Sequence, residues 1–519
     1  MKTRPKGAGP SEKRVREPFS LSPVEKGSRT RFSPARPLLV ATVLCVAVLT
    51  AAGGGQAPNW PSENPPRPLP SRPVNFPPYE LHTLNNGMQV IVVMHHEQPE
   101  VSMRLLVRAG AAYDPPGKSG VAALTAQLLS QGTSTRSAQE IAGTIDSIGG
   151  LLDTGAGSDL TSANVAVMKD SFPLGMELLA DVVRQPAFAP EEIDRRRAQA
   201  LSTLQVNLDD PDFIAGAVFN RLVYGSHPYA QPDTGMPDSI ARITRDDIRE
   251  FHRKYFAPNN SILAIVGDVE AAEAMTAAER VFGDWPMQPV QAPRFPPPPK
   301  PARRVVVIDK PDSVQTAVRV GQLGVPRKTP DYMAINEALR ILGGEGSNRL
   351  YRVLRSDRSL TYSASADLNT MLMAGDFVAQ TDTRSDATPE VVKLIVEQFW
   401  RLLRDRVNDG ELAGAQAYMT GSFPLSIETP GAIARQVVNV VFYDLSLDEL
   451  RTYRQRANGV TPDDVQRVAR NYLDPDRLSI VMVGNAAAFK DQLKKAGFGR
   501  YELVTLDELD LTSPDLKKH

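Results

Sequence analysis

An internal repeat constrains the fold of this chain more than any other feature of the sequence. Residues 244–268 and 461–485 align without a gap, 217 residues apart, and share 8 identical residues in 25. Each stretch predicts a threonine-capped helix, a turn with proline and a buried strand that ends in Val-Gly. The stretches close two similar lengths of chain, so we interpret the repeat as a duplication. The expected fold is α+β, with two homologous halves, each a mainly antiparallel sheet with packed helices.

The first 55 residues differ in composition from the rest. Residues 1–36, a basic leader, carry ten Lys/Arg against three Asp/Glu, a net charge of +7, so the remaining chain carries −8 of the total of −1. Residues 37–52 are apolar and uncharged, and 37–55 are predicted to be a signal peptide or a signal anchor. This run is shorter than the roughly 20 residues that span a bilayer, which favours cleavage, with a membrane tether through 37–52 as the alternative.

These features predict an exported protein, either periplasmic or anchored in the inner membrane of a bacterium. The only cysteine, Cys45, lies within the apolar run, so the mature chain is expected to have neither a disulfide nor a thiolate site. The acidic remainder lacks the basic footprint of a nucleic-acid-binding protein. A nucleic-acid partner is therefore not expected.

Proline-rich segments predict the remaining boundaries. Residues 56–78 are interpreted as a tether, and the run FPPPPKP predicts a linker at 291–302. The two halves are then 79–290 and 303–500, followed by a C-terminal tail, 501–519. Within the first half, Asn85-Asn86-Gly87 predicts a hairpin turn, and alternating apolar residues over 101–107 predict a half-buried strand.

Four stretches carry a resemblance to a known family. They are LNNGMQVIVV (84–93), VRAGAAYDPPGKSGVA (107–122), LDDPDFIAGAVFNRLVYGSHPYA (208–230) and LGGEGSNRLYRVLRSDRSLTYSASA (342–366). In this order, over some 420 residues, they resemble the pitrilysin, insulysin and mitochondrial processing peptidase family, particularly its short bacterial members. The resemblance implies that the two halves together form half of a clamshell chamber.

The family's zinc-binding helix is present in outline without its ligands. An inverzincin helix carries H-x-x-E-H, with two histidine ligands and a glutamate as general base. The corresponding positions are Ala123, Ala126 and Gln127, and the third ligand, a glutamate in the family, corresponds to Thr203. Alanine offers no lone pair, and a neutral amide is a weak zinc ligand. The resemblance therefore implies that this chain holds no metal and no cofactor and is inactive alone.

The second half retains a pair that the family uses opposite the zinc. Arg355 and Tyr362, seven residues apart, match an arginine and a tyrosine that reach toward the scissile peptide in the family. Both side chains donate hydrogen bonds and could hold a carbonyl oxygen and the oxyanion that forms from it. Gly343, Gly344 and Gly346 precede the pair and are either weak substrate-binding candidates or a tight turn.

The histidines do not suggest a replacement site. His95 and His96 are neighbours at a strand end, so their side chains should diverge. His227 is interpreted as a turn residue, and His252, on a charged helix, is expected to be solvated. The sequence contains no G-x-S-x-G, no P-loop and no complete G-x-G-x-x-G.

Two functions remain open at this point. The first is the non-zinc-binding subunit of an exported heterodimeric metallopeptidase, which acts on peptides with a homologous partner that carries an intact H-x-x-E-H motif and the zinc. The second is a catalytically inactive binding or scaffolding protein that retains the peptidase fold, because a fold does not determine a function.

Overall fold

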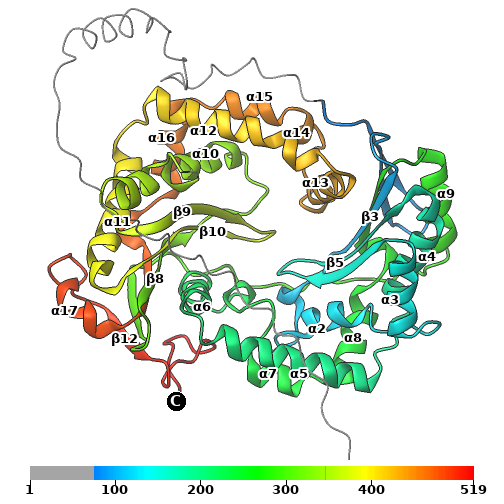
Figure 1. Ribbon diagram of the computed structural model, residues 1–519, viewed down its shortest axis with the longest axis horizontal. Coiled ribbons are helices and arrows are strands. Elements are labelled where there is room, and N and C mark those ends of the chain that lie inside the picture. Colours follow the sequence, from blue (N-terminus) through cyan, green and yellow to red (C-terminus); the bar gives the residue numbers. More distant parts are fainter. Residues whose placement is uncertain (1–74, 345) are drawn as a thin grey trace, which may run out of the picture. The chain divides into compact units, whose positions relative to one another are not determined.

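Two six-stranded sheets organise the chain in the computed structural model, which describes residues 75–344 and 346–519 (Figure 1). All of these residues belong to one unit, 72–519. Among them, no helix has both the length and the apolar character needed to cross a membrane. The basic leader, the apolar run 37–52, Cys45 and most of the predicted tether lie outside the described residues.

The first sheet has the strand order β1-β2-β6-β3-β5-β4. Its strands are β1 Tyr79–Thr83, β2 Gln89–Met94, β3 Glu100–Val107, β4 Leu151–Ala156, β5 Thr161–Met168 and β6 Ser261–Gly267. Only β2 and β6 pair in parallel, and the other neighbours are antiparallel. The predicted hairpin is confirmed, with Gly87 at φ +84° in the turn between β1 and β2.

The second sheet has the order β12-β7-β11-β8-β10-β9. Its strands are β7 Arg304–Asp309, β8 Gln315–Leu323, β9 Thr361–Thr370, β10 Gly375–Arg384, β11 Ser479–Gly484 and β12 Glu502–Thr505. The five strands from β7 to β9 repeat the order and the directions of the five from β2 to β4. Only the outermost strand differs, because β12, within the predicted tail, pairs in parallel with β7. The expected fold class, with two similar halves, is confirmed.

Helices cover both sheets. Those of the first half are α2 Val121–Leu128, α3 Ala138–Ser147, α4 Phe172–Arg184, α5 Pro190–Asn207, α6 Pro211–Tyr224, α7 Pro237–Arg242, α8 Arg245–Tyr255 and α9 Ala271–Phe282. Those of the second are α10 Tyr332–Gly343, α11 Thr388–Arg404, α12 Asp409–Ser422, α13 Pro430–Phe442, α14 Asp448–Arg451, α15 Tyr453–Asn458, α16 Pro462–Tyr472 and α17 Lys490–Leu493. The proline-rich stretch 286–303 contains neither helix nor strand.

The repeat that predicted the duplication forms matching structures. Thr244 caps α8 and Thr461 caps α16, each in a capping box with an aspartate three residues later. The strands that follow, β6 and β11, are completely buried and lie at the third position of their sheets. A short motif at the same place in both halves thus forms the centre of each sheet.

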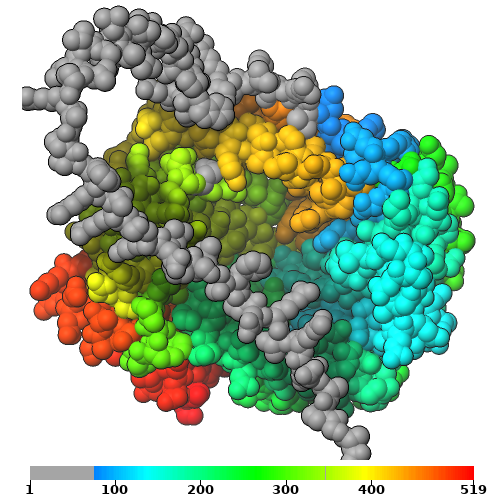
Figure 2. Space-filling model, viewed as in Figure 1, coloured from blue at the N-terminus to red at the C-terminus, as the bar shows by residue number. Residues whose placement is uncertain are grey.

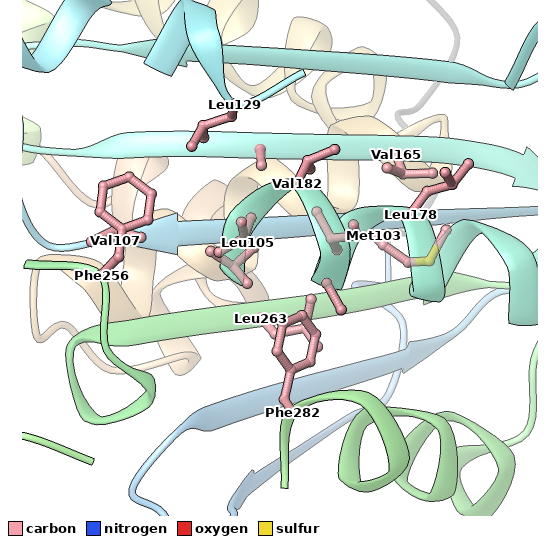
Figure 3. Close-up of a cluster of buried hydrophobic side chains, with 14 of the residues drawn as sticks. Met103, Leu105, Val107, Leu129, Val165, Leu178, Val182, Phe256, Leu263 and Phe282 are labelled. Carbon is pink, nitrogen blue, oxygen red and sulfur yellow. The ribbon is translucent and has the colours of Figure 1, made fainter. Parts of the chain in front are cut away.

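The main core of the first half lies between its sheet and α2, α4, α8 and α9. Met103 and Leu105 project from β3 toward Leu178 and Val182 of α4, and Val107 lies near Phe256 (Figure 3). Their spacing of two along the strand puts all three on one face. The second sheet packs in the same way on α10, α11 and α16.

The opposite face of each sheet is covered by a helix from the other half. Helix α13, from the second half, packs on β6, β3 and β2, with Ile433 and Val437 in the shared cluster. Helix α6, from the first half, packs on β11 and β8, with Ile214 and Val218 in the equivalent place. In Figure 2 the orange-yellow atoms of the α13 region lie against the blue atoms of the first strands. The halves therefore exchange one helix each.

Polar contacts hold the exchanged helices. Arg108, just after β3, donates from its guanidinium to the carbonyl oxygen of Phe442 at 2.7 Å and to that of Val441 at 3.3 Å. A cation at this helix C-terminus also favours the helix dipole. In the other direction, the Tyr224 hydroxyl of α6 donates to Asp376 on β10 at 2.7 Å.

The exchange corrects one prediction about β3. Alternation predicted a half-buried strand, yet Ser102 and Leu106, on its second face, are also buried. Helix α13 covers that face, and this helix lies more than 320 residues away in the sequence. Burial of both faces is thus a consequence of long-range packing.

Glu337 on α10 is a fully buried acid. Its Oε2 accepts a hydrogen bond from Gln416 at 3.4 Å, and its Oε1 has no hydrogen-bond partner among the described residues. Burial raises the pKa of Glu337 from 4.5 to about 8. The folded protein therefore keeps this proton to a higher pH than the unfolded chain does.

We expect Glu337→Gln to stabilise the protein relative to the wild type progressively as the pH rises from 4.5 to 8. Over this window the unfolded chain has released the Glu337 proton and the folded chain retains it, so the wild type loses stability with rising pH, by roughly 4 kcal/mol at most. The neutral amide does not titrate. Urea unfolding at pH 5 and pH 8 measures the difference, with Glu428→Gln at an exposed position as the control. Parallel stability profiles for wild type and Glu337→Gln would contradict this expectation.

Candidate functional site

Helices α2 and α5 lie next to each other (Figure 1) and are in contact. A cavity of about 230 Å³ lies between them. Its lining residues are Ala123, Leu124, Gln127, Arg196, Gln199, Ala200, Thr203, Leu204, Asn207, Thr234 and Ile240. Leu124, Leu204 and Ile240 are buried, whereas Gln199 and Thr203 are exposed. The cavity thus has an apolar interior and polar residues toward solvent.

The loop before α2 fixes the start of this helix. Asp114 accepts hydrogen bonds from the backbone N–H groups of Gly120 at 2.6 Å and Ala122 at 2.7 Å. Burial raises the pKa of Asp114 to about 7. Gly120 lies at φ +102°, and a Cβ there would lie 2.9 Å from the Thr234 carbonyl oxygen. The turn therefore favours glycine. The close approach at Gly120 places the start of α2 against the segment with Thr234, which also lines the cavity.

The structure brings three of the four predicted zinc-site positions together. Ala123 and Gln127 lie on one face of α2, and Thr203 faces them from α5, all three lining the same cavity. Ala126 is completely buried and does not line it. A methyl group, an amide and a hydroxyl do not form a zinc-binding set. Within 75–344 and 346–519, no group of three or more His, Cys, Asp or Glu is placed to hold a metal ion.

Among the described residues, Arg196 is the only charged one that lines the cavity. The flanking arginines are both ion-paired, Arg195 with Glu192 at 2.5 Å and Arg197 with Asp194 at 2.6 Å. Arg196 donates to the Gln199 side chain at 3.1 Å, and its Nε is buried without a hydrogen-bond partner among the described residues. Burial, and then the charge of Arg195, lower the pKa of Arg196.

The sequence interpretation missed Arg196. The local signal was ambiguous, because Glu192 stands three positions before Arg195 and four before Arg196, and the structure pairs it with Arg195. On a helix, an ion pair needs its carboxylate three or four residues away. Whether the remaining guanidinium faces a cavity depends on how α2 packs on α5.

The predicted pair in the second half also lies together. Arg355 lies near the end of a π-helical turn, Tyr351–Ser356. Tyr362 is the second residue of the edge strand β9. The Arg355 guanidinium donates to the Tyr362 carbonyl oxygen at 2.6 Å. It lies 4.5 Å from the centre of the Tyr362 ring and 5.0 Å from that of Tyr351. The Tyr362 side chain is exposed, at 81%.

The glycines before this pair have different structural roles. Gly343 ends α10 where the helix crosses β9, and a Cβ there would lie 2.2 Å from the Ala366 nitrogen. Gly344 is crowded by Arg340 of its own helix, whereas a Cβ on Gly346 would meet nothing closer than 3.9 Å. Close packing of helix on strand therefore accounts for Gly343.

One histidine prediction is wrong. His252 is half-buried, packs beside Phe188 and Phe256, and has its Nε2 2.8 Å from the Val183 carbonyl oxygen. Burial lowers its pKa to about 4, so it is neutral at physiological pH. The charged neighbours lie on the other face of α8, and for this reason composition alone suggested solvation.

His96 and His227 have structural partners, and His95 is largely buried. His96 Nδ1 lies 2.7 Å from an Asp268 carboxylate oxygen, and His95 has only 10% of its side chain exposed. His227 precedes a short 3₁₀ turn and accepts a hydrogen bond from the Tyr229 N–H at 3.3 Å, as a turn residue would. None of these contacts forms a ligand cluster.

Two family models match this chain. Residues 89–227 match insulinase, peptidase family M16, and residues 242–419 match the peptidase M16 inactive domain. An uncharacterized zinc protease of Streptomyces coelicolor is 25% identical over 411 residues, covering 78% of this chain and 88% of that protein. One of Bacillus subtilis is 22% identical over 395 residues, covering 75% and 93%.

Solved structures agree with these matches. A crystal structure of a peptidase M16 inactive domain from Pseudomonas fluorescens has a TM-score of 0.75 and 29% identity, covering 78% of this chain and 98% of that one. A protease from Helicobacter pylori has a TM-score of 0.74 at 22% identity, covering 78% and 99%, and so shares the fold. Both similarities extend over almost the whole length of the solved chains.

Proposed function

Because this chain belongs to peptidase family M16, we propose that it is the non-zinc-binding subunit of an exported heterodimeric zinc metallopeptidase. The observation that carries the proposal is the chemistry of the cavity between α2 and α5. The positions that would hold zinc carry Ala123, Gln127 and Thr203, while Arg355 and Tyr362 remain side by side. A homologous partner with an intact H-x-x-E-H helix would supply the zinc, and a peptide is the substrate.

Arg355 and Tyr362 act on the substrate in this proposal. A guanidinium and a phenol both donate hydrogen bonds, and donors of this kind stabilise the negative charge that develops on a carbonyl oxygen during peptide cleavage. The hydrogen bond from Arg355 to the Tyr362 carbonyl oxygen restricts the Arg355 side chain. The other N–H groups of the guanidinium are left to donate to a substrate. The exposed Tyr362 can meet a substrate held by another chain.

Export completes the proposal. The basic leader 1–36 and the apolar run 37–52 support secretion into the periplasm or retention at the inner membrane through an uncleaved anchor. The substrate would then be an extracytoplasmic peptide. In this proposal each chain supplies two halves, and the four halves together enclose the chamber in which the peptide is cleaved.

We expect the purified mature chain to retain no stoichiometric zinc and to cleave no peptide by itself. Its three ligand positions offer at most weak neutral oxygens. Mixing it with a homologous H-x-x-E-H chain should produce peptide cleavage that neither chain has alone. Metal analysis after zinc exposure and desalting, then cleavage assays on each chain and on the mixture, measure this.

Two results would contradict the proposal. One zinc held tightly by this chain alone would mean that the ligands lie elsewhere. Full activity of the H-x-x-E-H chain without this one would favour the scaffolding alternative. A partner that carries Glu→Gln in its H-x-x-E-H motif is the matched control, because it can assemble but lacks its general base.

A further inference from the structure

The cavity between α2 and α5 has the properties of a ligand-binding site, independently of any partner chain. An apolar cavity of about 150 Å³ holds a benzene molecule, and this one measures about 230 Å³. Leu124, Leu204 and Ile240 provide apolar walls, and Gln127 and Asn207 provide amide groups. A ligand with a branched aliphatic group and a few polar atoms fits this combination.

The charge of the cavity selects an anion. Arg196 contributes the only formal charge among the described residues of the lining. Glu192 acts on this charge at a distance, but Glu192 and Asp194 form their ion pairs with other arginines. A guanidinium in a partly desolvated place is unfavourable until an anion accompanies it. The half-buried position of Arg196 and its unpartnered Nε indicate that this requirement is not met within the described chain.

The form of the anion follows from the same residues. A guanidinium binds a carboxylate through two parallel hydrogen bonds, and Nε can be one of the two donors. A single arginine balances the one negative charge of a carboxylate but only part of the charge of a phosphate dianion. The exposed Gln199 and Thr203 mark the side from which an extended chain could enter.

We propose that this cavity binds the C-terminal residue of a peptide, with its carboxylate on Arg196 and an aliphatic side chain among Leu124, Leu204 and Ile240. Gln127 and Asn207 lie in the same lining and can hydrogen-bond the preceding amide. The cavity occupies the place of the family's metal and has become a carboxylate site.

The test is calorimetric titration of the full mature chain with N-acetyl-L-leucine and with N-acetyl-L-leucinamide. The two probes differ only in the charged carboxylate. The acid should bind and the amide should bind about 10-fold or more weakly, as expected for loss of a charged hydrogen bond. Arg196→Gln should weaken acid binding by a similar factor, and Arg196→Lys should retain part of it. Arg253→Gln, at an exposed arginine outside the cavity, is the control and should leave acid binding unchanged.

A second variant keeps the test decisive if Arg196→Gln does not fold, as judged by circular dichroism and thermal melting. Ala200→Leu places additional carbon atoms in the cavity and should abolish binding while Arg196 is retained. The proposal is overturned if the acid does not bind at millimolar concentration, if acid and amide bind equally, or if inorganic phosphate binds as tightly as the acid. Titration with 4-methylpentanoate distinguishes a peptide C-terminus from a free aliphatic acid. Only the peptide C-terminus has an amide that can gain from the contacts with Gln127 and Asn207, so 4-methylpentanoate should bind more weakly than N-acetyl-L-leucine.

Discussion

Residues 75–302, produced without the second half, should not form a soluble folded domain. This fragment lacks α13, so the apolar face formed by β2, β6 and β3 would be exposed to water. The apolar face of its own α6 would also be exposed, because the sheet that α6 covers is missing. Large exposed apolar patches promote aggregation. Soluble yield and circular dichroism of the fragment measure the effect. Co-production with residues 303–519 should restore a soluble complex.

A pair of variants on α13 tests the same contact in the intact chain. Val437 is completely buried against the first sheet, whereas Arg435 on the same helix is exposed. Val437→Asp buries an unpaired carboxylate and should cost about 3–5 kcal/mol or more, enough to unfold many domains. Arg435→Gln should have little effect. An isolated first half that is monomeric and unfolds cooperatively would contradict the interdependence of the halves.

The second large effect concerns catalysis by the reconstituted pair. Arg355→Ala or Tyr362→Phe should lower kcat/KM by roughly 10²-fold or more, the usual loss when one oxyanion donor is removed. Tyr362→Phe is the cleaner change, because the ring that Arg355 stacks on is retained. Steady-state peptide cleavage by the pair gives the value.

Assembly must be followed in parallel with these kinetics. Size-exclusion chromatography should show that both variants still associate with the partner, so that the loss is assigned to the reaction. Tyr351→Phe, at the other ring beside Arg355, is a suitable control because it removes a hydroxyl and keeps the stacking. Unchanged kinetics for both Arg355→Ala and Tyr362→Phe would reject the proposed role of the pair.

Much of the local structure could be predicted from the sequence. The hairpin at Gly87 and the capping boxes at Thr244 and Thr461 depend on residues close together in the chain, and the duplication was visible as a repeat of such local patterns. Such features need only backbone conformation and neighbouring side chains. The chemistry at the predicted zinc-site positions was equally readable, because the identity of a side chain determines whether it can bind a metal.

The exchange of α6 and α13 was not predicted, although the two helices share a pattern. Pro211, Ile214, Ala215, Val218, Asn220 and Tyr224 of α6 match Pro430, Ile433, Ala434, Val437, Asn439 and Tyr443 in and just after α13. Periodicity identifies the apolar face of each helix. It does not say which of two similar sheets that face covers.

The sequence by itself therefore determined the duplicated fold, and it supplied the predicted zinc-site positions and the predicted pair Arg355 and Tyr362. Only the tertiary structure decided that β3 is buried on both faces, that His252 is not solvated, and that Arg196 lines a cavity. The physical reason is the range of the interactions. Hydrogen-bonded turns, helix caps and ligand chemistry are local, whereas burial and desolvation depend on which distant surfaces meet.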